Sequence, residues 1–141
     1  MAPSRRRGSN TVEFALILPI FLALVGTLME YSFYFFMRSA VARSVRDGCR
    51  AGAVIPPDHT PSPEDTAENE MKEGMGGYNF FGADCDDADD SSCSVGSETS
   101  GSSPTEMLTC TMTMNYSGIT GVVPVPEVIT YSALNILEVQ R

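Results

Sequence analysis

The feature that most constrains this chain is an apolar run from Phe14 to Met37, which holds 24 residues and a single charge, Glu30. A helix needs about 20 apolar residues to cross the hydrocarbon core of a bilayer, so the run is long enough to span one. A buried core helix is one alternative, but nothing else in the chain is apolar enough to bury so wide a surface. A cleaved secretory signal is another, with Ala40–Ala42 as its small-residue site, although its apolar region should hold only about 7–15 residues.

The charges divide the chain of 141 residues into two parts of opposite sign. Residues 1–50 carry seven arginines against three acidic residues, whereas residues 51–141 carry two basic residues against fifteen acidic ones. Because Arg5–Arg7 precede the span, we expect the N-terminus in the cytoplasm and the acidic part outside. The acidic part would repel phosphate, so we expect no nucleic-acid partner. We also expect no enzyme, because the sequence shows no nucleophile–base pair, phosphate loop or pair of catalytic acids.

The helical pattern continues beyond the apolar run until Pro56 and Pro57. At 100° per residue, Arg43, Arg46 and Arg50 share one face. The opposite face carries small and apolar residues, namely Val41, Val45, Gly48, Gly52 and Ile55. We therefore predict one helix over 9–55, about 67 Å long from Ser9 to Ala53. Its transmembrane part covers about 14–37, and its outer half is amphipathic and needs a packing partner.

Residues 56–138 predict a small extracytoplasmic domain of the α+β class. Ser62–Lys72 is a short helix, because Ser62 is a suitable N-cap and Pro63 suits the first turn. Residues 74–104 are rich in Gly, Ser and Asp and are predicted to be mostly loop, with a variable acidic loop over 83–105. The long helix is expected to pack on a small C-terminal antiparallel β-sheet.

The sheet is predicted from the segments 107–116 and 128–139. In the first, Thr109, Thr111, Thr113 and Asn115 alternate with Cys110, Met112, Met114 and Tyr116. A period of two indicates a half-buried strand. The second segment can be a returning strand that gives way to irregular chain or a short helix.

Four cysteines, Cys49, Cys85, Cys93 and Cys110, all follow the span and lie on the oxidising side if the N-terminus is inside. An even count in a small domain suggests two disulfides, for which three pairings are possible. We favour Cys85–Cys93, which staples the acidic loop, and Cys49–Cys110, which clamps the amphipathic helix to the sheet. A Cys93–Cys110 link would instead place those two residues on neighbouring strands.

The acidic loop also raises the question of a metal site. Asp84–Asp90 holds five carboxylates, which suit calcium, but it lacks the spacing and trailing glutamate of an EF-hand. A solvated acidic loop is the favoured alternative. The chain has no C-x-x-C pair, and its one histidine, His59, lies in a proline loop. We therefore expect no metal and no cofactor.

The residues around the apolar run carry a family resemblance. Gly8 is followed by four residues, then Glu13, then the run, which resembles the processing signal of type IV pilin-like proteins. The segments "EFALILPIFLALVGTLMEYS", "VRDGCRAGA" and "VITYSALNILE" resemble the TadE-like minor pseudopilins of tight-adherence (Tad/Flp) secretion systems. The resemblance is strong over residues 5–55, weaker over 105–138 and absent over 56–104.

The resemblance implies a minor pilin or pseudopilin whose leader, residues 1–8, is removed by a prepilin peptidase that cuts after Gly8. The mature chain would begin at Ser9, insert in the bacterial inner membrane and join other pilin or pseudopilin subunits and the assembly platform in a tight-adherence type IV pilus. The alternative is an uncleaved single-pass membrane protein whose acidic extracytoplasmic domain binds partners.

Two carboxylates are candidates for assembly. Cleavage would free the amine of Ser9, and Glu13 could accept from its own amine or from that of a neighbouring subunit, because a charge in apolar surroundings must be paired. Alternatively, Glu13 is an interfacial residue favoured by the helix dipole. Glu30 corresponds to a second glutamate of the TadE-like pattern. It either contacts another subunit or sits at the outer lipid interface, with the aromatic residues of "YSFYFF" as a belt.

Overall fold

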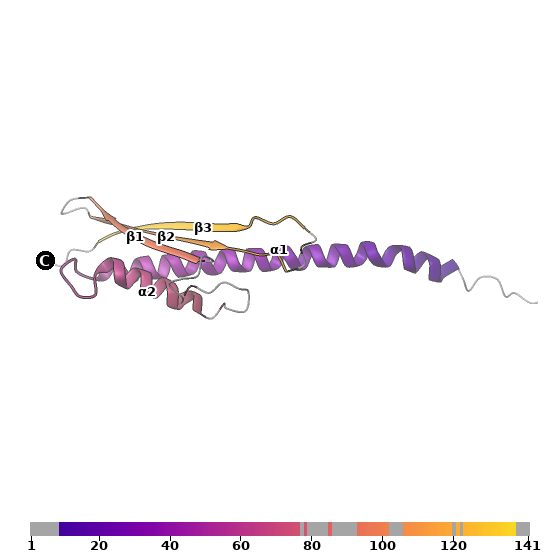
Figure 1. Ribbon diagram of the computed structural model, residues 1–141, viewed down its shortest axis with the longest axis horizontal. Coiled ribbons are helices and arrows are strands. Elements are labelled where there is room, and N and C mark those ends of the chain that lie inside the picture. Colours follow the sequence, from indigo (N-terminus) through magenta and orange to yellow (C-terminus); the bar gives the residue numbers. More distant parts are fainter. Residues whose placement is uncertain are drawn as a thin grey trace, which may run out of the picture. The chain divides into compact units, whose positions relative to one another are not determined.

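The structure is a computed structural model that describes residues 9–76, 78, 85, 93–101, 106–119, 121 and 123–137. Its elements follow in the order α1 (Ser9–Val54), α2 (Pro63–Met75), β1 (Cys93–Ser100), β2 (Met107–Asn115) and β3 (Val128–Ile136) (Figure 1). Two compact units share α1: the first joins its residues up to Tyr34 with Gly118–Val125, and the second joins Phe35–Ser117 with the chain from Pro126 onward. The predicted α+β class, with a long apolar N-terminal helix and a small antiparallel sheet, is confirmed.

Helix α1 is continuous over 46 residues and includes Pro19. Its C-terminal part is amphipathic as predicted, because Arg43, Arg46 and Arg50 are exposed whereas Val41, Val45, Gly48 and Gly52 are buried. Ile55 follows the helix and is half-buried. The helix ends just before Pro56, which cannot donate to the helical hydrogen-bond ladder and restricts the residue before it.

Helix α2 begins where the sequence predicts and extends one turn further than Lys72. The side chain of Ser62 is the N-cap and accepts the backbone N–H of Asp65 at 3.1 Å. Acidic residues in the first turn and Lys72 in the last complement the helix dipole. The helix buries Pro63, Ala67, Met71 and Met75, and this narrow apolar stripe is its packing surface.

The three strands form one antiparallel sheet in the order β1-β2-β3. Strand β2 alternates as predicted, since Leu108, Cys110, Met112 and Met114 are buried. On its other face, hydroxyl pairs cross to β3, at 3.0 Å between Thr111 and Ser132 and 3.2 Å between Thr113 and Thr130. The returning segment is a regular strand up to Ile136 and pairs with β2 over its whole length.

Strand β1 corrects the sequence prediction, which placed residues 93–100 in a loop. The segment lacks a strong apolar alternation, so its sequence alone does not predict a strand. Two partners stabilise it: β2 pairs with it from Cys93 to Ser100, and α2 accepts hydrogen bonds from its outer edge. The backbone N–H of Ser97 donates to Glu68 at 3.1 Å, and that of Thr99 donates to Glu64 at 2.9 Å. Long-range pairing therefore overrides a weak local preference.

The outer half of α1 packs closely on α2 through small residues. At Gly48, an added Cβ would lie 2.8 Å from the carbonyl oxygen of Ala67, and at Gly52 it would lie 2.5 Å from that of Pro63. The Ser44 hydroxyl donates to the carbonyl of Met71 at 2.6 Å. The absence of side chains at the two glycines therefore allows the helix backbones to approach closely.

Two disulfides tie the second unit together, and they have the pairing that the sequence favours. Cys49 on α1 is bonded to Cys110 on β2 with a Cα–Cα distance of 5.7 Å, and Cys85 is bonded to Cys93 with a distance of 5.2 Å. Figure 1 shows the strands lying along the C-terminal part of α1, where the first of these bonds joins helix and sheet. Arg46 adds a second link, because its Nε donates to the Tyr131 hydroxyl at 2.8 Å.

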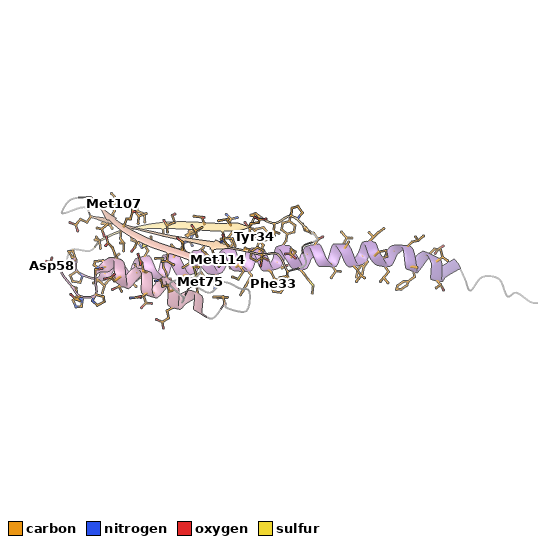
Figure 2. The ribbon with its side chains drawn as sticks, viewed as in Figure 1. Phe33, Tyr34, Asp58, Met75, Met107 and Met114 are labelled. Atoms are coloured by element: carbon orange, nitrogen blue, oxygen red, sulfur yellow. A yellow bond between two sulfur atoms is a disulfide. The ribbon has the colours of Figure 1, made fainter. Side chains whose placement is uncertain are left out.

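Methionine supplies much of the core of the second unit. Met75 on α2 and Met114 on β2, both labelled in Figure 2, are fully buried. Met37, Met71 and Met112 are also fully buried. The unbranched thioether side chain fills irregular gaps, which suits a core where two helices meet a small sheet.

Candidate membrane and assembly site

The N-terminal half of α1 exposes a broad apolar surface. Eight large apolar side chains are each between 58% and 69% exposed: Phe14, Leu16, Ile17, Ile20, Phe21, Leu22, Leu24 and Leu28. Among the described residues, α1 is the one helix that is long and apolar enough to cross a membrane, and its most apolar window is not buried within the chain. An apolar surface of this size needs lipid or another protein as its surroundings.

The proposed processing site lies at the start of this helix. Gly8 is outside the described residues, and Ser9 is the first residue of α1. Glu13 follows one turn later and is exposed. Cleavage after Gly8 would make Ser9 the N-terminus. The exposed carboxylate of Glu13 lies about 6 Å from Ser9 along the helix axis.

Two small residues lie further along the apolar half. Ala23 is exposed, and no atom lies within 4 Å of a Cβ added at Gly26. Small residues are common where membrane helices approach one another closely. This patch is thus open in the single chain and has the composition of a helix-contact surface.

Glu30 lies in the same apolar half but in a different environment. Its side chain is 0% exposed. One carboxylate oxygen accepts the backbone N–H of Ile119 at 2.8 Å, and Gly118 lies directly against the same oxygen. These residues belong to the connection between β2 and β3, which forms one compact unit with this part of α1. The chain therefore buries this carboxylate and supplies a backbone N–H to one of its oxygens.

Sequence reasoning did not foresee this contact, since it assigned Glu30 either to a neighbouring subunit or to the lipid interface. The segment from Ser117 to Pro126 gave no distinct signal, because the whole stretch from Met107 to Pro126 is free of charge. Nothing in that segment specifies residue 30 as its neighbour, because the two are separated by 89 positions. The contact depends on the tertiary structure alone.

The five aspartates of the acidic loop, which is expected to be solvated, lie outside the described residues, namely Asp84, Asp86, Asp87, Asp89 and Asp90. Within the described part of the chain, no group of three or more His, Cys, Asp and Glu side chains is placed to hold a metal ion. His59 is exposed in the connection between α1 and α2. The apolar surface, Glu13, the small-residue patch and Glu30 all lie on α1. The structure does not bring the two glutamates together, because about 25 Å of helix separates them.

Comparison with known proteins agrees with these features. A model of the TadE-like protein family matches residues 8–50, which confirms the predicted family resemblance for that segment. The match begins at Gly8, includes Glu13 and Glu30 and stops near the end of α1, so it does not reach α2 or the sheet. Neither a curated protein nor a solved structure matches the chain. The TadE-like segment and the apolar helix together indicate a membrane protein related to a Tad pilus.

Proposed function

We propose that this chain is a minor pilin, or pseudopilin, that a prepilin peptidase cuts after Gly8 and that takes part in assembly of a tight-adherence type IV pilus. The single observation that carries the proposal is the division of α1. The TadE-like match covers most of α1. The N-terminal half of the helix exposes apolar side chains, whereas its C-terminal half is bonded to a small domain. A subunit that moves from a bilayer into a helical bundle needs both parts.

The charges support an orientation for this subunit. Arg5–Arg7 precede the apolar run, and residues 51–141 carry a large acidic excess. Basic flanks stay on the cytoplasmic side. The leader would then face the cytoplasm, and the disulfide-bonded domain would lie outside the inner membrane, where disulfides persist. This arrangement presents Gly8 to a peptidase at the cytoplasmic surface.

Glu13 is proposed as the residue that aligns the subunit during assembly. Cleavage would free the Ser9 amine, and a charged amine in an apolar bundle needs a carboxylate. Because Glu13 is exposed on α1, it is accessible to the amine of its own chain or of a neighbour. Pairing with a neighbour would fix the axial stagger between the two helices.

Glu30 is proposed to contribute to assembly indirectly. Its side chain has no exposed surface in the single chain that it could offer to another subunit. Its bond to the Ile119 N–H instead holds Gly118–Val125 against the helix. The carboxylate would thus shape the surface that this part of the subunit presents.

Substitution of Glu13 tests the proposal. Glu13→Gln keeps the size of the side chain but removes the charge that pairs with the amine. We expect this variant to be inserted and processed at wild-type levels but to be lost from sheared pili and from cross-linked assembly complexes. Glu13→Asp retains the charge on a shorter arm and should restore part of the incorporation. Wild-type incorporation of Glu13→Gln would show that Glu13 is only an interfacial residue.

The acidic charge of residues 51–141 favours a second candidate function. In it, the chain is an uncleaved single-pass membrane protein, and its acidic domain binds cationic partners outside the membrane. The two candidates differ in covalent structure, because only the pilin loses residues 1–8. The mass of the chain isolated from cells therefore separates them.

A further inference from the structure

The connection between β2 and β3 contains an uncharged segment that forms a compact unit with the apolar half of α1. The sequence from Ser117 to Pro126, "SGITGVVPVP", has no charged residue, and it continues an uncharged stretch that begins at Met107. Ile119 within it is 54% exposed, and Val123 and Val125 are half-buried. The segment therefore presents an exposed apolar side chain, as β3 also does at Leu134, but it does so beside the apolar half of α1.

This segment is associated with the apolar half of α1. Gly118–Val125 and the residues of α1 up to Tyr34 form one compact unit. The hydrogen bond from the Ile119 N–H to Glu30, at 2.8 Å, fixes which turn of the helix the segment meets. A side chain at Gly118 would displace the carboxylate, because an added Cβ would overlap its oxygen. The association is thus specific in position.

The position of Glu30 gives the depth of this contact. The predicted transmembrane part, about 14–37, is longer than the roughly 20 residues that cross the hydrocarbon core, so a core that begins at Phe14 ends near Phe33. Glu30 then lies about 5 Å inside the outer boundary of the hydrocarbon. A carboxylate at that depth needs hydrogen bonds, and irregular backbone is tolerated there only where protein satisfies its polar groups. The contact gives the Glu30 carboxylate a donor and gives the Ile119 N–H an acceptor.

We propose that Gly118–Val125 is a membrane anchor, which rests on Glu30 at the outer boundary of the hydrocarbon and inserts the Ile119 side chain among the lipid acyl chains. The occupant of this surface is lipid, because the segment is uncharged and adjoins the membrane-spanning part of α1. The proposal rests on the membrane insertion of α1 proposed above. It adds a second, non-helical contact between the subunit and the bilayer.

Tryptophan fluorescence tests the anchor, because the chain contains no tryptophan. Three single variants of the full chain, Leu22→Trp, Ile119→Trp and Leu134→Trp, are reconstituted in phosphatidylcholine vesicles with and without brominated acyl chains. Leu22 lies in the span, and Leu134 on β3 is the matched control, because it is 59% exposed and also apolar. We expect brominated lipid to quench the emission at positions 22 and 119 and to leave the emission at position 134 unchanged.

Several results would overturn the anchor, and they separate its failure from that of the proposed function. If position 22 is quenched and position 119 behaves like position 134, α1 is inserted but the segment does not reach lipid. If all three positions are quenched equally, contact with lipid is not specific to the segment. If position 22 is not quenched, α1 is not inserted, and the proposed function fails together with the anchor.

A second pair of variants tests the role of Glu30 in positioning the anchor. In the Ile119→Trp chain, Glu30→Leu removes the acceptor for the Ile119 N–H, whereas Glu30→Gln retains an oxygen at the same place. We expect loss of quenching at position 119 with Glu30→Leu and wild-type quenching with Glu30→Gln. Unchanged quenching with Glu30→Leu would contradict the role of Glu30, and quenching at position 22 verifies that both variants are inserted.

Discussion

The N-terminal half of α1 exposes its large apolar side chains from Phe14 to Leu28, whereas the C-terminal half buries its apolar face from Met37 to Ala53. The backbone is one continuous helix in both. The difference lies in the distribution and size of the side chains. Apolar residues surround the first half, but they form a stripe interrupted by glycine in the second. A helix that is apolar all round needs apolar surroundings, and a stripe needs one packing partner.

The two halves of α1 also differ in their packing partners. The second half packs on α2 and the sheet through Gly48, Gly52 and the Cys49–Cys110 bond. The first half leaves Gly26 open and its apolar surface uncovered. Apart from the contact of Glu30 with Gly118 and Ile119, this half must find its partners outside the chain, as lipid or as the helices of other subunits. The following predictions test this division, from the largest expected effect to the smallest.

Removing the bond between helix and sheet should have the largest effect. Cys49 and Cys110 are 61 positions apart, and Cys85 and Cys93 are 8 apart. Loop-closure entropy gives about 4 kcal/mol for the long loop and about 2.5 kcal/mol for the short one. Replacing Cys49 and Cys110 together by Ser should therefore reduce protease-resistant full-length chain in detergent far more than replacing Cys85 and Cys93 together. Equal losses from the two double variants would contradict the role of the clamp.

Alanine at a glycine should act differently in the two halves. At Gly52, the added Cβ would lie 2.5 Å from the Pro63 carbonyl oxygen and 2.8 Å from atoms of Ala67 and Leu108. We expect Gly52→Ala to lower the free energy of unfolding by about 1–3 kcal/mol, because α1 and α2 must move apart. Gly26→Ala is the matched control, and it should leave stability unchanged or slightly higher. Urea unfolding in detergent measures both, and a loss at Gly26 as large as at Gly52 would refute the division.

The contact between Arg46 and Tyr131 should have the smallest effect. The guanidinium lies 5.3 Å from the centre of the ring and donates to its hydroxyl. Both groups are at least partly exposed, so solvent weakens the interaction. We expect Arg46→Ala to destabilise by about 1 kcal/mol or less, with Arg43→Ala as the control for loss of a neighbouring charge. A loss comparable to that of the Cys49–Cys110 bond would show that this contact, and not the disulfide, holds the helix on the sheet.

The sequence predicts the elements whose signals are local. The apolar run and the prolines after Val54 bound α1, Ser62 and Pro63 bound α2, and the alternation of β2 identifies its buried face. These signals are sufficient because each reflects a property of neighbouring residues in the chain. The sequence also favoured the observed pairing of the cysteines, because Cys49 lies beside the face of its helix that was predicted to pack on the sheet.

The features that escaped prediction depend on contacts between distant residues. Strand β1 forms because β2 pairs with it and because Glu64 and Glu68 accept its outer N–H groups. Glu30 is buried because Ile119 reaches it across 89 positions. Neither segment carries a periodic pattern that specifies its partner. The same limit applies to the candidate site: Gly8 and Glu13 stand out by their spacing, whereas the segment against Glu30 became visible only in the structure.

The mature N-terminus is the measurement that tests the central claim most directly. The chain is isolated from membranes and from sheared pili, and its intact mass and first residues are determined. We predict a chain that begins at Ser9, and we predict that Gly8→Ile prevents the cut because a peptidase subsite fitted to glycine cannot hold a branched side chain. Ser4→Ile adds the same bulk elsewhere in the leader and should be processed normally. A chain that begins at Met1, or that is cut after Ala42, would contradict the account.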